Sequence, residues 1–240
     1  MIALVDIGNS RTKFCVMSEG TRGSVQRIPN ELLTSDYLTE FLKNIDKLIV
    51  ASVSRYELTD KIESWCQEHN ITYQKVVSEQ CRYDVMSAYH KPSQLGVDRW
   101  LTLIAVNTLH ASKNCLIIDA GTATTIDVLA CNGKHQGGWI LAGIDTLFSC
   151  VLDNTSQVQA NAVNNASLSF GTSSSENVNN ATWAATIGAI DLAVSQSNKQ
   201  GVNIDKIILT GGNGKILASL LSHPCTVIDD LVFIGLQAYV

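Results

Sequence analysis

The sequence LVDIGNS at residues 4–10 and the sequence IIDAGTA at residues 117–123 follow one pattern. In each, an apolar run typical of a buried strand ends at an aspartate, followed by one variable residue, a glycine and two small residues. After each glycine-containing turn the chain resumes as a strand, so each stretch predicts a β-hairpin. Because the pattern occurs once near the start of each half of the chain, it indicates an internal duplication.

The segments around these hairpins alternate between strands and helices. Residues 47–53 have the composition of a strand, residues 57–69 have helical spacing, and residues 182–195 form an alanine-rich helical stretch. Strands alternating with helices predict an α/β fold with layered sheets and helices. We expect two domains, residues 1–111 and residues 112–240. The Ser-, Asn- and Thr-rich stretch 152–180 has the composition of a loop.

The composition excludes several classes of protein. The chain has 240 residues, of which 45% are hydrophobic and 16% charged, as in folded globular proteins. A net charge of −5 with mixed signs argues against a nucleic-acid surface. No apolar stretch approaches the roughly 20 residues that span a bilayer. The seven cysteines include no C-x-x-C pair, which favours reduced thiols. We therefore expect a cytoplasmic protein that binds neither nucleic acid nor membrane.

The first hairpin has the residues of a phosphate site. Gly8 allows backbone N–H groups to approach an anion, the hydroxyls of Ser10 and Thr12 can donate hydrogen bonds, and Lys13 adds a positive charge. Asp6, at a strand end, suits hydrated Mg²⁺, which keeps most of its water ligands. The predicted phosphate-binding residues are Asp6, Ile7, Gly8, Asn9, Ser10, Arg11, Thr12 and Lys13. From these residues alone, an ordinary hairpin with Asp and Gly as turn formers remains the alternative.

The second hairpin and a third, glycine-rich turn extend the pattern. Residues 119–125 carry four hydroxyl or carboxyl groups, more than a turn requires, and residues 211–214 read GGNG. Two hairpins in register with such a turn resemble the actin-like kinases, in which two hairpins hold the phosphates and the third turn borders the adenosine. The resemblance implies two duplicated actin-like (ribonuclease H-like) domains with a nucleotide cleft between them.

Four motifs narrow the resemblance from the actin-like kinases in general to a single family among them. Residues 95–99, LGVDR, resemble the G-x-D-R motif of type III pantothenate kinases, and residues 6–13 match that family's D-x-G-N-[ST]-x-x-K. Residues 119–125 match D-x-G-T-A-x-T. Residues 137–143, GGWILAG, match G-G-x-I-x-P-G except that Ala142 replaces the proline. The resemblance covers nearly the whole chain.

The resemblance implies a reaction and a set of substrate contacts. The γ-phosphoryl group of ATP would pass to the primary hydroxyl of pantothenate, giving 4'-phosphopantothenate in the first step of coenzyme A biosynthesis. Asp98 would be the general base, Arg99 would pair with the substrate carboxylate, and Tyr89 would contact the substrate. Without the other motifs, the preferred interpretation of Asp98 is an aspartate favoured by the dipole of a helix first turn. The implied substrate-binding residues are Tyr89, Gly96, Val97, Asp98, Arg99 and Ser174.

Ser174 comes from the segment that matches least well. The family has Asn-Thr and then Gln-Ser-Gly at the head of the long helix, whereas this chain has Ser173-Ser174 and then Asn179-Asn180-Ala181. The hydroxyl of Ser174 keeps a hydrogen bond to substrate possible.

The family resemblance also implies cofactors and a partner. Asp119 would hold a monovalent cation, K⁺ or NH₄⁺, Asp6 would hold Mg²⁺ through water, and Thr122 would contact the nucleotide. A homodimer is implied, with the apolar helix around Trp100 as one source of an interface; the alternative is that Trp100 belongs to the core. Two alternatives remain: a kinase of the same fold for a sugar or acetate, and a non-catalytic regulatory accessory factor.

Overall fold

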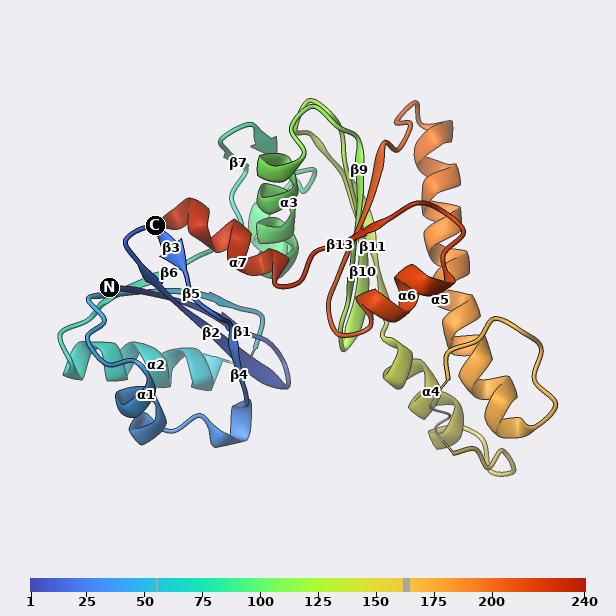
Figure 1. The fold of residues 1–240 in the computed structure, drawn as a ribbon, viewed down its shortest axis with the longest axis horizontal. Coiled ribbons are helices and arrows are strands. Elements are labelled where there is room, and N and C mark those ends of the chain that lie inside the picture. Colours follow the sequence, from blue (N-terminus) through green and yellow to red (C-terminus); the bar gives the residue numbers. More distant parts are fainter. Residues whose placement is uncertain (55, 162–164) are drawn as a thin grey trace. The chain divides into compact units, whose positions relative to one another are not determined.

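The structure is a computed structural model that describes residues 1–54, 56–161 and 165–240. The chain folds into two compact units (Figure 1). The first unit comprises residues 1–82, 89–105 and 230–240, and the second comprises residues 83–88 and 106–229. The last segment returns to the first unit, so the compact units do not follow a single cut in the sequence. The division into residues 1–111 and 112–240 stays a prediction about domains.

The first unit is built on a sheet of strand order β3-β2-β1-β5-β6, in which β4 also pairs with β2. β1 is antiparallel to β2, with Asp6 opposite Lys13, and parallel to β5. The strands are β1 (Ile2–Ile7), β2 (Arg11–Ser18), β3 (Thr21–Arg22), β4 (Gln26–Pro29), β5 (Lys47–Ser52) and β6 (Thr72–Lys75), with the short β7 (Cys81–Arg82) after them. The helices are η1 (Asn30–Leu32), α1 (Ser35–Phe41), α2 (Tyr56–Glu68), η2 (Pro92–Gln94), α3 (Val97–Leu109), α7 (Leu231–Leu236) and η3 (Gln237–Tyr239). Residues 106–109 of α3 belong to the second unit.

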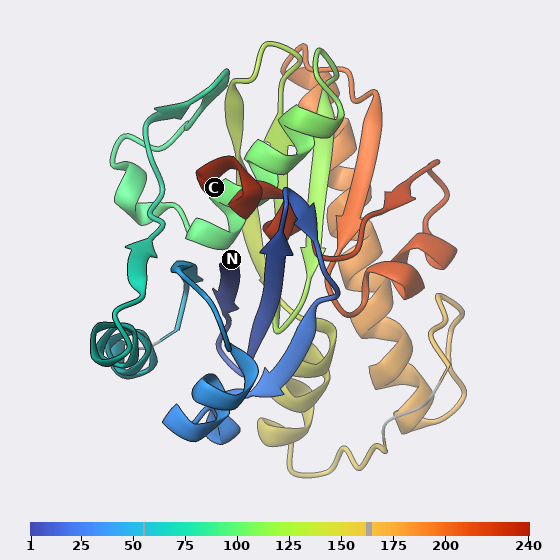
Figure 2. The ribbon, with the colours of Figure 1, turned by 60° about the vertical axis from the view of Figure 1, so that its left-hand side comes forward.

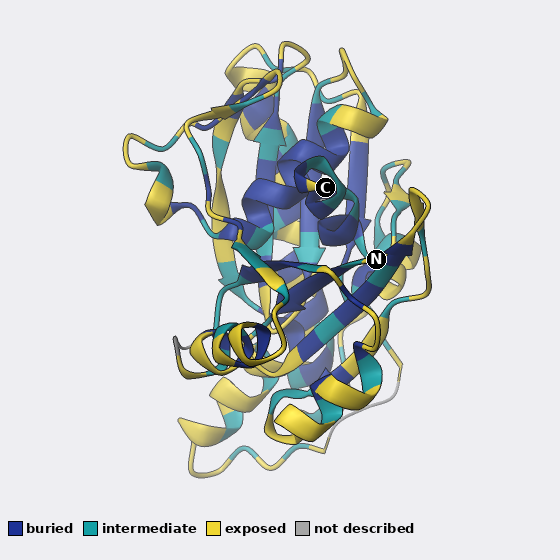
Figure 3. Cartoon of the chain, turned by 90° about the vertical axis from the view of Figure 1, so that its left-hand side faces the viewer, coloured by how far each residue is buried: buried dark blue, intermediate teal, exposed yellow. Residues whose placement is uncertain are grey.

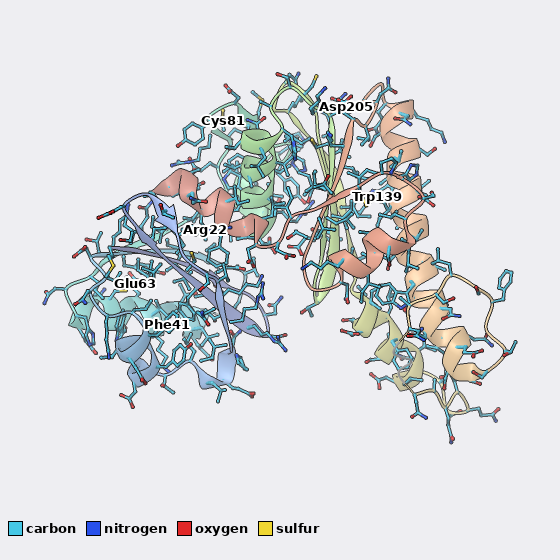
Figure 4. All side chains as sticks on the ribbon, viewed as in Figure 1. Arg22, Phe41, Glu63, Cys81, Trp139 and Asp205 are labelled. Carbon is cyan, nitrogen blue, oxygen red and sulfur yellow. The ribbon has the colours of Figure 1, made fainter. Side chains whose placement is uncertain are left out.

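The core of the first unit lies between this sheet and α1 and α2. Phe14 is fully buried, and its ring lies 5.8 Å from that of Phe41, which is labelled in Figure 4. Tyr37 stacks on Phe41 at 5.6 Å, within the range in which aromatic pairs add about 0.5–1.5 kcal/mol each. The strands of this sheet are largely buried, whereas the outer faces of α1 and α2 are exposed (Figure 3). This packing fixes β1 and β2, the two strands of the predicted phosphate hairpin.

The second unit repeats the same arrangement of strands. Its sheet has the order β11-β10-β9-β12-β13, with β9 antiparallel to β10 and parallel to β12, as β1 is to β2 and β5. The elements are β8 (Val85–Met86), β9 (Cys115–Ala120), β10 (Ala123–Leu129), β11 (His135–Ala142), α4 (Ile144–Asp153), α5 (Ser174–Lys199), β12 (Lys206–Thr210), α6 (Gly214–Leu220) and β13 (Thr226–Val227). The predicted duplication of the two hairpins is therefore confirmed by the topology.

Helix α5 covers one face of the second sheet (Figure 2). Trp183, Ile187 and Ile190 are spaced at one helical turn and are buried against Ile118 and other residues of the strands. This apolar stripe explains why a helix with many polar residues is stable here.

The start of α5 corrects the expectation of a loop through residue 180. The helix begins at Ser174 because Ser173 caps it: its hydroxyl accepts a hydrogen bond from the N–H of Glu176 at 3.3 Å. The carboxylate of Glu176 in turn accepts from the N–H of Thr172 at 2.7 Å, a bond that lowers the pKa of Glu176. This reciprocal capping is written in the sequence as Ser-x-x-Glu.

Two further observations bear on the sequence-based expectations. Among the helices of the described residues, none is long and apolar enough to cross a membrane. The seven cysteines, all of which lie in the described residues, form no disulfide.

Candidate functional site

Asp6 and Lys13 form an ion pair across the first hairpin. The Lys13 Nζ lies 3.6 Å from Oδ2 of Asp6, because the two residues are directly opposite in the β1–β2 register. The turn between them is closed by a hydrogen bond of 3.0 Å from the N–H of Gly8 to the carbonyl of Arg11. The carboxylate, the lysine and the turn are therefore held at the end of a buried strand.

Asp6 is poorly solvated, with only 8% of its surface exposed. Burial raises its pKa above the usual value of 3.8, while the charge of Lys13 acts in the opposite direction. The negative charge of Asp98 also raises the pKa of Asp6. The phosphate hairpin and the predicted base therefore lie within electrostatic range of each other in one unit.

Asn30, which the sequence did not single out, is bonded to the turn of this hairpin. Its Nδ2 donates to the carbonyls of Gly8 at 2.8 Å and Asn9 at 3.1 Å, and its Oδ1 accepts from the Thr12 hydroxyl at 2.7 Å. Asn30 follows β4, and the antiparallel pairing of β4 with β2 brings it beside the turn. No local pattern marks this residue, because the contact depends on which strand β4 pairs with.

The G-x-D-R residues form the start of α3. Asp98 lies in the first turn, and its Oδ1 accepts a hydrogen bond of 2.7 Å from the N–H of Arg99. A Cβ on Gly96 would lie 2.5 Å from that oxygen, so a side chain at position 96 would displace the carboxylate. Glycine at position 96 therefore makes room for the carboxylate of Asp98. Val97 is buried in the core.

The structure brings Arg99 and Tyr89 together. Nη1 of Arg99 donates to the Tyr89 hydroxyl at 2.9 Å, and the guanidinium lies 5.7 Å from the ring centroid. Arg99 is only 3% exposed, so its guanidinium is far from bulk water. Two residues predicted separately to bind substrate thus belong to one cluster.

Trp100 does not provide an interface. Its side chain is fully buried, and its indole N–H donates to the Tyr239 hydroxyl at 3.0 Å. The expectation that the helix face around Trp100 supplies a dimer contact is wrong, because that face packs inside the first unit.

In the second unit, the Asp119 hairpin packs against the glycine-rich turn. Gly211 has a φ of +85° and lies so close to Asp119 and Ala120 that a side chain there would collide with both. The N–H of Asn213 donates to the carbonyl of Ala120 at 3.0 Å. The structure therefore places two of the predicted motifs side by side.

Thr122 is held by the head of α4. Its carbonyl accepts from the N–H of Gly143 at 3.0 Å and from the hydroxyl of Thr146 at 3.1 Å. Ser174, by contrast, is an exposed residue at the first position of α5. Within the described residues, its side chain forms no hydrogen bond to another predicted site residue.

Cation ligands are sparse in both units. In the described residues, no group of three or more His, Cys, Asp or Glu side chains could hold a metal ion. An ion at Asp6 or at Asp119 would therefore take most of its ligands from water, hydroxyl and carbonyl oxygens or the nucleotide. The buried hydroxyl of Thr124, which has no hydrogen-bond partner among the described residues, lies in the same hairpin as Asp119.

Comparisons with known proteins agree with this arrangement. Residues 2–196 match the family profile described as type III pantothenate kinase. A protein of that name from Colwellia psychrerythraea is 45% identical over the full length of both chains. A crystal structure from Campylobacter jejuni, assigned by its description to a Baf family of transcriptional activators, has 25% identity and a TM-score of 0.63 over 98% of this chain and 95% of that one.

The fold is shared more widely. A Sinorhizobium meliloti protein described as a 2-dehydro-3-deoxygalactonokinase has 14% identity and a TM-score of 0.58, covering 99% of this chain and 97% of that chain. These neighbours establish the actin-like fold.

Proposed function

The chain belongs to the type III pantothenate kinase family, and on that premise we propose how its residues carry out the reaction. It is a kinase that phosphorylates pantothenate in coenzyme A biosynthesis, using ATP as the phosphoryl donor and giving 4'-phosphopantothenate. The observation that carries the assignment of roles is that Asp98 lies within electrostatic range of Asp6, the acidic residue of the phosphate hairpin.

Asp98 is the proposed general base. The hydroxyl of pantothenate is a poor nucleophile at neutral pH, and a positioned carboxylate can accept its proton as the bond to phosphorus forms. Gly96 keeps the space that this carboxylate occupies. Asp98 lies close enough to Asp6 for its charge to raise the pKa of Asp6, so the proposed base lies beside the phosphate hairpin.

The first hairpin is proposed to bind the phosphates of ATP. Lys13 supplies positive charge, and the residues Asp6, Ile7, Gly8, Asn9, Ser10, Arg11 and Thr12 supply the turn, its N–H groups and its hydroxyls. Asp6 would hold Mg²⁺ through water, and the metal would neutralise charge on the phosphates. In the second unit, Thr122 would contact the nucleotide and Asp119 would bind K⁺ or NH₄⁺.

Pantothenate is proposed to contact Tyr89 and the start of α3, including Gly96, Val97 and Arg99. Because Arg99 is buried and bonded to Tyr89, it would orient the tyrosine and place positive charge near the substrate carboxylate. Direct pairing of Arg99 with that carboxylate, and a hydrogen bond from Ser174, stay predictions.

A homodimer is proposed, with its contact in the second unit. An apolar groove of about 310 Å³ runs between α4 and α5, lined by Leu147, Val151, Asn177, Val178, Ala181, Thr182 and Ala185. Trp139, labelled in Figure 4, and Ile140 add exposed apolar surface on β11. Light scattering at micromolar concentration tests the dimer: a mass of twice 26.0 kDa supports it, and a single 26.0 kDa species refutes it.

The alternative of a regulatory factor has one observation in its favour, the description of the Campylobacter jejuni relative. A coupled assay of ADP release distinguishes a pantothenate kinase from a non-catalytic regulatory factor. A kinase for pantothenate releases ADP when pantothenate is added and not with acetate or a sugar. A non-catalytic factor releases none with any of the three acceptors.

A further inference from the structure

The turn of the first hairpin is contacted by Asn30 through its backbone and its side chain. The side-chain amide donates to the carbonyls of Gly8 at 2.8 Å and Asn9 at 3.1 Å. The N–H of Asn30 donates to the carbonyl of Ser10 at 3.1 Å. Three consecutive carbonyls of the turn are therefore bonded to one residue.

These bonds decide the direction of the N–H groups of the turn. In a planar trans peptide the carbonyl of one residue and the N–H of the next point to opposite sides. Holding the carbonyls of Gly8 and Asn9 toward Asn30 therefore aims the N–H groups of Asn9 and Ser10 away from it. Within the described residues, neither N–H has a protein acceptor. Adjacent N–H groups with a common direction are a binding site for an anionic oxygen.

The orientation of the Asn30 amide is itself fixed. Oδ1 accepts a hydrogen bond of 2.7 Å from the Thr12 hydroxyl, which is fully buried, so the NH₂ group must face the turn. Packing does not fix the turn on this side, because Asn9 and Asn30 line a cavity of about 400 Å³ together with Ser54, Glu57 and Leu58. Hydrogen bonds therefore hold the turn where side-chain packing does not.

We propose that Asn30 is a positioning residue for the nucleotide: by binding the carbonyls of Gly8 and Asn9, it orients the N–H groups that receive the phosphates of ATP. This inference rests on the proposed phosphate-binding role of the hairpin and adds a residue from outside the motif. Asn30 acts through the turn and does not touch the phosphates.

The test uses the full-length protein and the variant Asn30→Asp. The carboxylate has the same shape and keeps an acceptor for Thr12, but it cannot donate to the two carbonyls and repels them. We expect ATP to bind about tenfold or more weakly, since each lost hydrogen bond is worth on the order of 1 kcal/mol and leaves a carbonyl without its donor. The KM for pantothenate should stay within about twofold, because the turn lies outside the proposed pantothenate contacts.

Two further variants keep the result interpretable. Asn30→Ala removes the donors without adding charge and should also weaken ATP binding about tenfold. Gln26→Glu makes the same amide-to-carboxylate change at an exposed position of β4, so its ATP affinity should equal that of wild type. Thermal unfolding of all three variants identifies any loss of folding.

Calorimetric titration with ATP and Mg²⁺, without pantothenate, measures the affinity. Weaker binding in both Asn30 variants, with unchanged binding in Gln26→Glu, supports the proposal. Wild-type affinity in folded Asn30→Asp and Asn30→Ala overturns it, even if wild-type protein phosphorylates pantothenate. The proposal is also overturned if the KM for ATP and the KM for pantothenate rise equally in the Asn30 variants, because that outcome indicates a general loss of structure.

Discussion

The guanidinium of Arg99 donates a hydrogen bond of 2.9 Å to the hydroxyl of Tyr89. Arg99 lies in the first turn of α3, next to Asp98, and is almost completely buried. A buried cation needs hydrogen-bond acceptors, and the tyrosine oxygen supplies one of them. The contact therefore ties the segment that carries Tyr89 to the helix that carries the proposed base.

Tyr89→Phe should weaken pantothenate binding without affecting ATP. The change keeps the ring but removes the hydroxyl that accepts from Arg99, and a hydrogen bond to a charged group is worth about 1.5–3 kcal/mol. We expect the KM for pantothenate to rise about tenfold and the KM for ATP to stay unchanged. Tyr83→Phe, at a tyrosine that is 68% exposed, is the matched control. An unchanged KM for pantothenate in Tyr89→Phe would remove Tyr89 from the substrate site.

Asp6→Asn should abolish most activity and yet stabilise the fold at neutral pH. Burial raises the folded-state pKa of Asp6 above the usual 3.8, so the unfolded chain releases this proton at lower pH than the folded chain. The stability of wild type relative to Asp6→Asn therefore falls as the pH rises from about 4 through the folded-state pKa. The asparagine variant, which cannot ionise, does not lose this stability.

Urea unfolding at about pH 4 and about pH 7 measures the effect. The advantage of Asp6→Asn over wild type should be larger at the higher pH. Asp36→Asn, at an exposed aspartate of α1, should show no such trend. An Asp6→Asn variant whose advantage shrinks with rising pH would show that Lys13 outweighs burial.

The predictable part of the fold lies in its local patterns. LVDIGNS and IIDAGTA predict the two hairpins, and the antiparallel pairs β1–β2 and β9–β10 confirm them. What the sequence does not show is long-range pairing. Tyr239 accepts from the indole of Trp100, 139 residues away, and this contact is part of the packing that makes Trp100 a core residue.

The same limit applies to the candidate site. Asp98, Gly96 and Arg99 are neighbours in sequence, so a motif reveals them together. Asn30 reaches the phosphate hairpin only because β4 pairs with β2, and nothing in its neighbours specifies that partner. The cap of α5, unlike the contact of Asn30, could be predicted from local sequence. Ser173 and Glu176 form a recognisable capping pattern, although the stretch around them has the composition of a loop.

Activity should be far higher in K⁺ or NH₄⁺ than in Na⁺. The Asp119 hairpin lacks a lysine, unlike the Asp6 hairpin, so a large, weakly hydrated cation there would offset the negative charge of the bound substrates. Rates must be compared at equal ionic strength, because screening alone changes the binding of charged ligands.

Asp119→Asn should weaken the response to K⁺ while leaving the fold intact, as judged by thermal unfolding. Asp153→Asn, at an exposed aspartate at the end of α4, should keep the full response. Equal wild-type rates in Na⁺ and K⁺, or an unchanged K⁺ response in Asp119→Asn, would leave Asp119 as a turn residue.

The role of Asp98 is tested most directly by mass-spectrometric detection of phosphorylated pantothenate formed from ATP, Mg²⁺ and pantothenate in K⁺ buffer. Wild type should form product and ADP in equal amounts. Asp98→Asn keeps an oxygen acceptor for the N–H of Arg99 and should fold normally, but turnover should fall by about 10²–10⁴-fold because the base is lost. Asp36→Asn, another first-turn aspartate, should retain wild-type turnover. Wild-type ADP formation that does not depend on pantothenate, or an Asp98→Asn enzyme within about threefold of wild type, would contradict the account.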